Sequence, residues 1–330
     1  MKKFLRIILF VFMIMCHSLS IAQQIPQYSH YLLNRLLVNP AYAGYHETYY
    51  AHVFYRNQWM RAGTPQYLSF AIDGKVTEGV NLGLIFSHER MGSLAVNSFS
   101  AIYAYRFQTS SESSLSFGLS LGAKHYGVGN LHPVDPGDPV LQRISKGWAP
   151  NVDVGVYYGS EMFYAGFSAR NITDKKTFGG FEADDFIIPL SSWNSVLTLG
   201  GALPLSEEIK FHPSLMWQED FINPSHIDVT AAFSYMERFW AGISFRTDQH
   251  FWKSKAPGDV NELYFMAIIA EVFITEQITL SYAYDFGLNQ GSRIYFGGHE
   301  VSLGFYFSRK PEKEVVRKPR YLGNCPYCPY

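Results

Sequence analysis

SLSFGLSLGAKH, residues Ser114 to His125, alternates large apolar residues with small or polar ones along its whole length. Successive side chains of a β-strand point to opposite faces, so Leu115, Phe117 and Leu119 share one face and Lys124 lies on the other. A barrel strand that crosses a membrane meets lipid on one face and the lumen on the other. The stretch therefore predicts a membrane-spanning β-strand.

Similar alternation recurs in segments of about ten residues, the length at which a tilted strand crosses the hydrocarbon. Only helices and closed barrels satisfy every backbone polar group in lipid, and the chain after residue 22 contains no long apolar run. The sequence predicts an all-β fold, a transmembrane antiparallel β-barrel of about 14 strands, in preference to a soluble β-sandwich. The expected strands are residues 48–58, 67–73, 80–87, 98–107, 114–125, 151–158, 162–170, 195–202, 210–217, 226–235, 239–246, 263–274, 278–286 and 301–307.

Residues 1–22 have the three parts of a signal peptide. They have a basic start, an apolar run over residues 7–15, and small residues in Ser20-Ile21-Ala22 where signal peptidase cuts. Cleavage before Gln23 predicts an exported protein. The alternative is a single transmembrane anchor, but the apolar run is shorter than the ~20 residues that a spanning helix needs.

The links between the expected strands alternate in length. Residues 127–150, 171–193, 247–262 and 287–300 form long links on one side, whereas tight links lie at 159–161 and 236–237 and around Gly74 and Ser111. Outer-membrane barrels have long extracellular loops, short periplasmic turns and an even strand number. We therefore expect an outer-membrane protein with both termini periplasmic. Its expected parts are an amino-terminal segment (23–47) that is a possible plug, the barrel (48–308) and a tail (309–330).

The charges of the expected strands lie opposite the bulky apolar row, as required where an Arg or Lys facing lipid near the midplane costs about 2–4 kcal/mol. Glu271 is placed inward by this cost alone, because its strand is apolar on both faces. The two signs balance, which favours side chains that pair across a filled interior over an open channel. The predicted lumen charges are Arg106, Lys124, Asp153, Arg170, Asp228, Arg246, Glu271 and Asp285.

Several other functions are disfavoured. A net charge of −1 argues against nucleic acid as a partner. No catalytic or cofactor motif is found at a defensible spacing, so we expect neither an enzyme nor a cofactor. His125, His132, Asp135 and Asp138 are interleaved with prolines, which favours a turn-rich loop over a metal site.

The tail ends in Cys325-Pro-Tyr-Cys328, which resembles the redox motif of glutaredoxins. Redox activity of that motif needs a helix amino terminus in a thioredoxin-like fold, and no such pattern occurs here. A local disulfide in the oxidising periplasm is favoured, with unpaired or intermolecular thiols as the alternative. We expect the tail to reach periplasmic partners.

Two motifs resemble a known family. Asn39-Pro40-Ala41-Tyr42-Ala43-Gly44, followed one strand later by Tyr55-Arg56-Asn57-Gln58-Trp59, is similar to the PorP/SprF family of Bacteroidetes outer-membrane proteins. The resemblance implies a component of the type IX secretion and gliding machinery. It implies secreted, adhesin-like surface cargo bound through its C-terminal domain, and machinery partners in the periplasm and outer membrane. The alternative function is a transport channel for small or hydrophobic solutes.

The same residues also carry a structural interpretation. An apolar stretch over 31–37 predicts a short helix that ends at Asn39-Pro40, because the residue before proline avoids the helical region. That helix either plugs the periplasmic mouth or merely leads into the barrel. If Tyr55 faces outer-membrane lipid, Arg56 and Gln58 face the lumen. Arg56 is then a structural anchor near the plug, in preference to a direct cargo contact.

Overall fold

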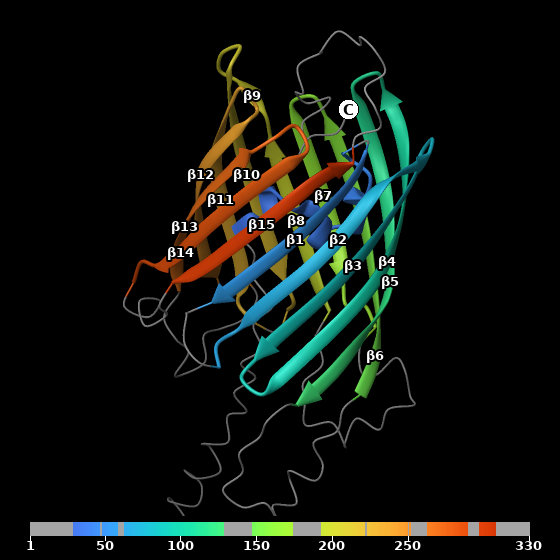
Figure 1. The fold of residues 1–330 in the computed structure, drawn as a ribbon, viewed down its shortest axis with the longest axis vertical. Helices are drawn as coiled ribbons and strands as arrows, with labels where there is room; N and C mark the ends of the chain where they lie inside the picture. Colours follow the sequence, from blue (N-terminus) through green and yellow to red (C-terminus); the bar gives the residue numbers. More distant parts are fainter. Residues whose placement is uncertain are drawn as a thin grey trace, which may run out of the picture.

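The strands of the computed structural model form one closed antiparallel barrel (Figure 1). The structure describes residues 29–46, 48–58, 63–128, 147–173, 193–221, 223–249, 251, 263–289 and 297–307. Strands that follow one another in the chain are paired, except that β8 and the short β9 both pair with β10, and the last strand pairs with the first over ten residue pairs, from Tyr49↔Phe307 to Gln58↔Gly298. This pairing removes both sheet edges, as a spanning sheet requires.

The described residues contain fifteen strands, and the two-residue β9 continues the line of β8 beyond Ala202, so the barrel wall they form has fourteen strands. The predicted fold class is confirmed, and each expected segment corresponds to a strand. The strands are β1 Tyr49–Gln58, β2 Gln66–Thr77, β3 Val80–Met91, β4 Leu94–Ser110, β5 Ser113–Val128, β6 Gly147–Ser160, β7 Phe163–Arg170, β8 Asn194–Gly201, β9 Leu203–Pro204, β10 Ile209–Glu219, β11 Ser225–Tyr235, β12 Phe239–Gln249, β13 Tyr264–Phe273, β14 Ile278–Gly287 and β15 Gly298–Phe307.

One expected turn is wrong. Gly74 lies inside β2, and the chain turns at Glu78–Gly79, where Gly79 has a φ of +73°. The ring of Tyr49 on β1 covers Gly74 so closely that a Cβ there would lie within 3.0 Å of it. An aromatic residue that packs over a strand glycine restores the contact area that the glycine lacks.

The two ends of the barrel differ. We call the end where Tyr49 pairs with Phe307 the turn end, and short connections such as residues 78–79, 111–112 and 161–162 join strands there. We call the opposite end, where Gln58 pairs with Gly298, the link end. Strand β5 ends there at Val128 and β6 begins there at Gly147; β7 likewise ends there at Arg170 and β8 begins there at Asn194.

The alternation in β5 sorts its side chains between the two faces of the wall. Phe117 and Leu121 are 50% and 53% exposed, whereas Ser114 and Ser116 are both 0% exposed. The exposed row is apolar and the buried row is small and polar, which is the arrangement of a wall between lipid and a filled lumen.

We expect Leu119→Lys to destabilise the barrel in lipid by about 2–4 kcal/mol, because Leu119 lies in the middle of this exposed apolar row. Leu115→Lys lies at the turn-end edge of the same row and should cost only ~0–1 kcal/mol. Urea unfolding of the protein refolded into vesicles measures both. Equal costs at the two positions would contradict the assigned lipid face.

The segment Ser29–His46, which we call the plug segment, lies inside the barrel (Figure 1). It contains three short 3-10 helices, η1 Ser29–Leu32, η2 Arg35–Leu37 and η3 Pro40–Tyr42. Pro40 begins η3 because its fixed φ suits a first helical position, and the Asn39 side chain caps it by accepting from the Ala41 N–H. None of the helices in the described residues is long and apolar enough to span a membrane.

Candidate functional site

The plug segment crosses the lumen between opposite walls. Near its start, the backbone N–H groups of Ser29 and His30 donate to Glu300 on β15. Further along, the Val38 carbonyl accepts a hydrogen bond of 2.6 Å from Ser168 on β7. Strands β7 and β15 lie seven places apart in the ring of fourteen. The segment is therefore held on two sides of the barrel at once.

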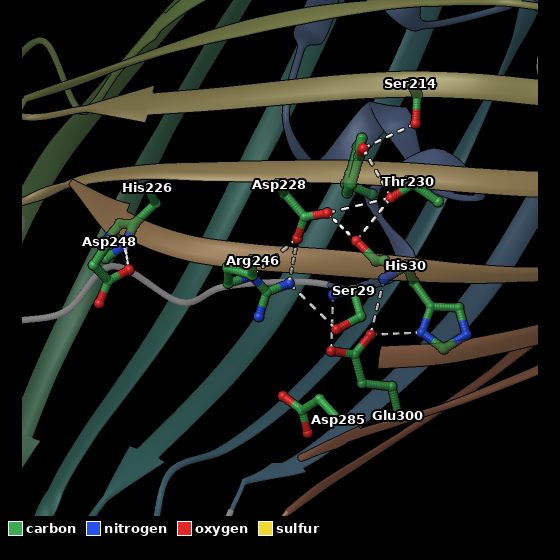
Figure 2. Close-up of polar contacts among 12 residues, drawn as sticks. Ser29, His30, Ser214, His226, Asp228, Thr230, Arg246, Asp248, Asp285 and Glu300 are labelled. Carbon is green, nitrogen blue, oxygen red and sulfur yellow. Dashed lines mark hydrogen bonds and ion pairs between the residues drawn. The ribbon is translucent and has the colours of Figure 1, made fainter. Parts of the chain in front are cut away.

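Glu300 is the centre of the first attachment (Figure 2). Its carboxylate, which is 1% exposed, accepts from the N–H of Ser29 and of His30 at 2.9 Å each and from Nδ1 of His30 at 2.6 Å.

A buried set of charges surrounds this attachment, and we call Arg56, Asp228, Arg246, Asp285 and Glu300 the anchor network. Arg56 forms ion pairs with Glu300 and, at 2.8 Å, with Asp285. Arg246 binds Asp228 through two nitrogens, at 2.9 and 2.8 Å, and donates to the Ser29 hydroxyl at 3.3 Å. The network contains three carboxylates and two guanidinium groups. The backbone N–H groups of the plug segment supply further donors to the Glu300 carboxylate.

Tyr31 and Arg35 of the plug segment contact two further parts of the barrel wall. The Tyr31 hydroxyl lies 2.9 Å from the Ser214 hydroxyl on β10 and donates to Thr230 on β11 at 3.1 Å. The Arg35 guanidinium lies 3.6 Å from the centre of the Tyr164 ring and donates to the Tyr157 hydroxyl. A cation over an aromatic face gains most where it is desolvated, and Arg35 is buried.

The Asn39-Pro40 end of the plug segment docks on glycines. Gly118 on β5 and Gly155 on β6 are register partners. A Cβ on Gly118 would lie within 3.0 Å of the Ala41 and Pro40 backbone, and one on Gly155 within 3.0 Å of the Asn39 amide oxygen. The Asn39 amide nitrogen donates to the Val156 carbonyl at 3.0 Å. The missing side chains thus create the space into which this end fits.

Tyr42 and Gly44 belong to the same Asn39–Gly44 motif and also contact their surroundings closely. The Gly44 N–H donates to Asp73 at 2.6 Å, with a φ of +74° that favours glycine, and a Cβ there would collide with Asn81. Tyr42 stacks on Tyr45 with ring centres 5.1 Å apart, and Arg106 lies 3.8 Å over the Tyr45 ring. The residues of the motif therefore fasten the plug to the barrel wall.

His46 ends the plug segment among the rings of Tyr42, Tyr50 and Tyr306. The centre of the His46 ring lies 5.7 Å from that of Tyr42 and 4.3 Å from that of Tyr50.

The other predicted lumen charges lie apart from the anchor network. Lys124 donates to the Asn171 side chain at 2.6 Å, and Asp153 accepts from the Asn171 N–H at 2.8 Å. Arg170 is the register partner of Asn194, and Glu271 on β13 is 6% exposed opposite Trp240.

Some predicted residues lie at the edge of the described chain or beyond it. Gln58 ends β1 half-buried, and its N–H donates to the Pro65 carbonyl. Trp59, Cys325 and Cys328 fall outside the described residues, as do three of the four suggested metal ligands. Within the described ranges no group of three His, Cys, Asp or Glu side chains is placed to hold a metal ion.

Glu300 was not predicted. The last strand was expected to begin at Val301, one residue too late to include it. Its position was readable from parity, because Val301, Leu303 and Phe305 form an outward apolar row and Glu300 falls on the opposite face.

Several barrels among solved structures resemble this fold at low sequence identity. The CymD monoaromatic hydrocarbon channel is 9% identical, with a TM-score of 0.48, over 86% of this chain and 94% of that one. A Pseudomonas aeruginosa FadL homologue is 10% identical, with a TM-score of 0.46, over 86% and 95%. The KdgM porin is 6% identical, with a TM-score of 0.38, over 78% and 99%.

No curated protein matches the sequence. The family model of the type IX secretion system membrane protein PorP/SprF matches residues 20–305, which include the plug segment and nearly all of the barrel. The resemblance noted from the two motifs is thereby confirmed, and this chain belongs to the PorP/SprF family.

Proposed function

We propose that this outer-membrane barrel is a plugged, non-enzymatic adaptor of the type IX secretion machinery. It binds adhesin-like surface cargo through the C-terminal domain of the cargo and contacts machinery proteins in the periplasm. The observation that carries the proposal is the attachment of the plug segment to both β15 and β7 by buried contacts. A barrel with a firmly held plug suits a binding role better than steady solute flow.

The turn end is proposed to face the periplasm. Short turns face the periplasm and long loops face outward in bacterial barrels, and Phe307 at the turn end leads into the tail. The tail, residues 309–330, then reaches periplasmic components of the machinery, and the link end receives cargo at the cell surface.

Two measurements test the adaptor proposal. Purification of the protein from native outer membranes, followed by mass spectrometry, should recover a large surface protein together with periplasmic machinery components. Planar bilayers should show no steady conductance, whereas a steady open pore would favour the alternative of a solute channel. Deletion of residues 312–330 should remove the periplasmic partners and keep the cargo, and their full retention would refute the role of the tail.

A further inference from the structure

Two buried side-chain amides in the lumen have no hydrogen-bond partner. Asn194 on β8 is 0% exposed and Gln218 on β10 is 2% exposed. Neither the oxygen nor the nitrogen of either amide is bonded within the part of the chain that the structure describes. A buried polar group without a partner costs free energy, and such groups are rare in native proteins. The two amides therefore need an explanation.

Both amides lie on the link-end side of the plug segment. Gln218 lies two residues beyond Met216 on the inward face of β10. Asn194 lies two residues before Val196 on the inward face of β8. Met216, Val196 and Val38 of the plug segment belong to one apolar cluster. Because β10 ends and β8 begins at the link end, the amides face the lumen between this cluster and that end of the barrel.

The polar neighbours of Gln218 are bound elsewhere. Asp220, two residues further along the chain, accepts from the N–H and from the side-chain amide of Asn223. His226, the register partner of Gln218 on β11, contacts the Asp248 carboxylate on β12 through Nδ1 (Figure 2). These neighbours therefore leave the amide of Gln218 open to a group from outside the wall.

The spacing of the two amides matches an extended peptide backbone. Gln218 is the register partner of Val196, so Asn194 is its diagonal neighbour, and such neighbours lie about 7–8 Å apart. Every second peptide group of an extended chain points the same way, at a repeat of roughly 6.6–6.8 Å. A carboxamide carries the same kinds of donor and acceptor as a peptide group. Each amide can therefore bond one peptide group of the same extended chain.

Arg170 adds a cation beside the two amides. It is the register partner of Asn194 and lies half-buried on the inward face of β7. None of the ion pairs among the described residues involves its guanidinium. A guanidinium binds a carboxylate through two parallel N–H bonds, so Arg170 can hold a carboxylate of the same ligand.

We propose that Asn194, Gln218 and Arg170 form a binding site for an extended peptide, whose backbone bonds the two carboxamides and whose carboxylate binds the guanidinium. The proposal rests on the proposed function and deepens it. It places an extended segment of the C-terminal domain of the cargo in the lumen at the link end, next to the plug segment.

Peptide binding to the purified protein tests the site. A mixed-sequence pool of peptides of about ten residues, long enough to span both amides, is equilibrated with the barrel in detergent, and mass spectrometry quantifies the retained peptide. The double variant Asn194→Leu/Gln218→Leu should retain about tenfold less than the unmodified protein. Gln249→Leu removes an amide that bonds Thr247 in its own strand, and this control should retain as much as the unmodified protein.

Three results would overturn the site. The first is no retention by the unmodified protein, or equal retention by the double variant. The second is equal retention of a pool with an N-methylated backbone, because the amides would then not bind peptide groups. The third is a lower urea midpoint of the double variant, because leucine in place of an unpartnered amide should leave the midpoint unchanged or raise it.

Arg170→Met should lower retention by about tenfold, and unchanged retention would exclude a role for Arg170. Amidation of the peptide C-terminus then identifies the carboxylate. Lost retention assigns it to the chain end, and kept retention to an acidic side chain.

Purification from native outer membranes separates this site from the adaptor function. If the double variant recovers the surface protein in full, the site fails and the adaptor function stands. If the unmodified protein recovers no surface protein but retains peptides in detergent, the adaptor function fails and the site stands.

Discussion

Gly118→Ala is expected to push the Asn39-Pro40 end of the plug segment out of place and to give the purified protein a conductance in planar bilayers. The new Cβ would lie within 3.0 Å of the Ala41 and Pro40 backbone, so no rotamer change relieves the overlap. Overpacking of this kind typically costs about 1–3 kcal/mol. We expect the plug segment to move rather than β5, because β5 is hydrogen-bonded to a strand on each side.

Gly83→Ala is the matched control. Gly83 is also an inward glycine of the wall, but its added Cβ would meet the Asp73 Cβ at 3.2 Å, an overlap that a shift of a few tenths of an ångström relieves. Heat-dependent migration on gels reports whether each barrel is folded. A folded Gly118→Ala variant with no more conductance than Gly83→Ala would contradict the docking role of Gly118.

Arg56→Met should destabilise the protein by about 3–5 kcal/mol, because it leaves the Asp285 and Glu300 carboxylates buried without their shared cation. Unfolding by urea in vesicles measures the loss. Adding Glu300→Gln to Arg56→Met should recover part of it by removing one of the two negative charges.

The Lys210–Glu237 pair provides the comparison, since Glu237 keeps 19% of its side-chain surface exposed and Lys210→Met should therefore cost less. If Arg56→Met costs no more than Lys210→Met, the anchor network does not hold the plug. The combined variant also separates charge repulsion from lost packing, because only the repulsion is relieved by Glu300→Gln.

The barrel was predictable because lipid imposes a simple rule on every strand. Charges near the midplane must turn inward, and the alternation of Leu115, Phe117 and Leu119 with small residues records that rule in the sequence. Strand ends were less predictable. The turn near Gly74 was misplaced because only the register of β1 brings Tyr49 over that glycine.

The site was predictable only in part. Arg56 was expected to be buried near a plug, and its partners are Asp285 and Glu300, which lie more than two hundred residues further along the chain. The docking surface was hidden, because Gly118 and Gly155 each resemble an ordinary small lumen residue. Their meaning depends on lying side by side in two strands, which a single sequence does not reveal.

The contact between Ser29 and Glu300 constrains the order of assembly. These residues are 271 positions apart, and Glu300 belongs to the final strand, whose pairing with β1 closes the ring. The start of the plug segment therefore gains its carboxylate partner only when the last strand of the barrel is in place. The contacts of the plug segment with β5, β7, β10 and β11 involve strands that precede β15 in the chain, so it is the contact with Glu300 that depends on closure of the ring.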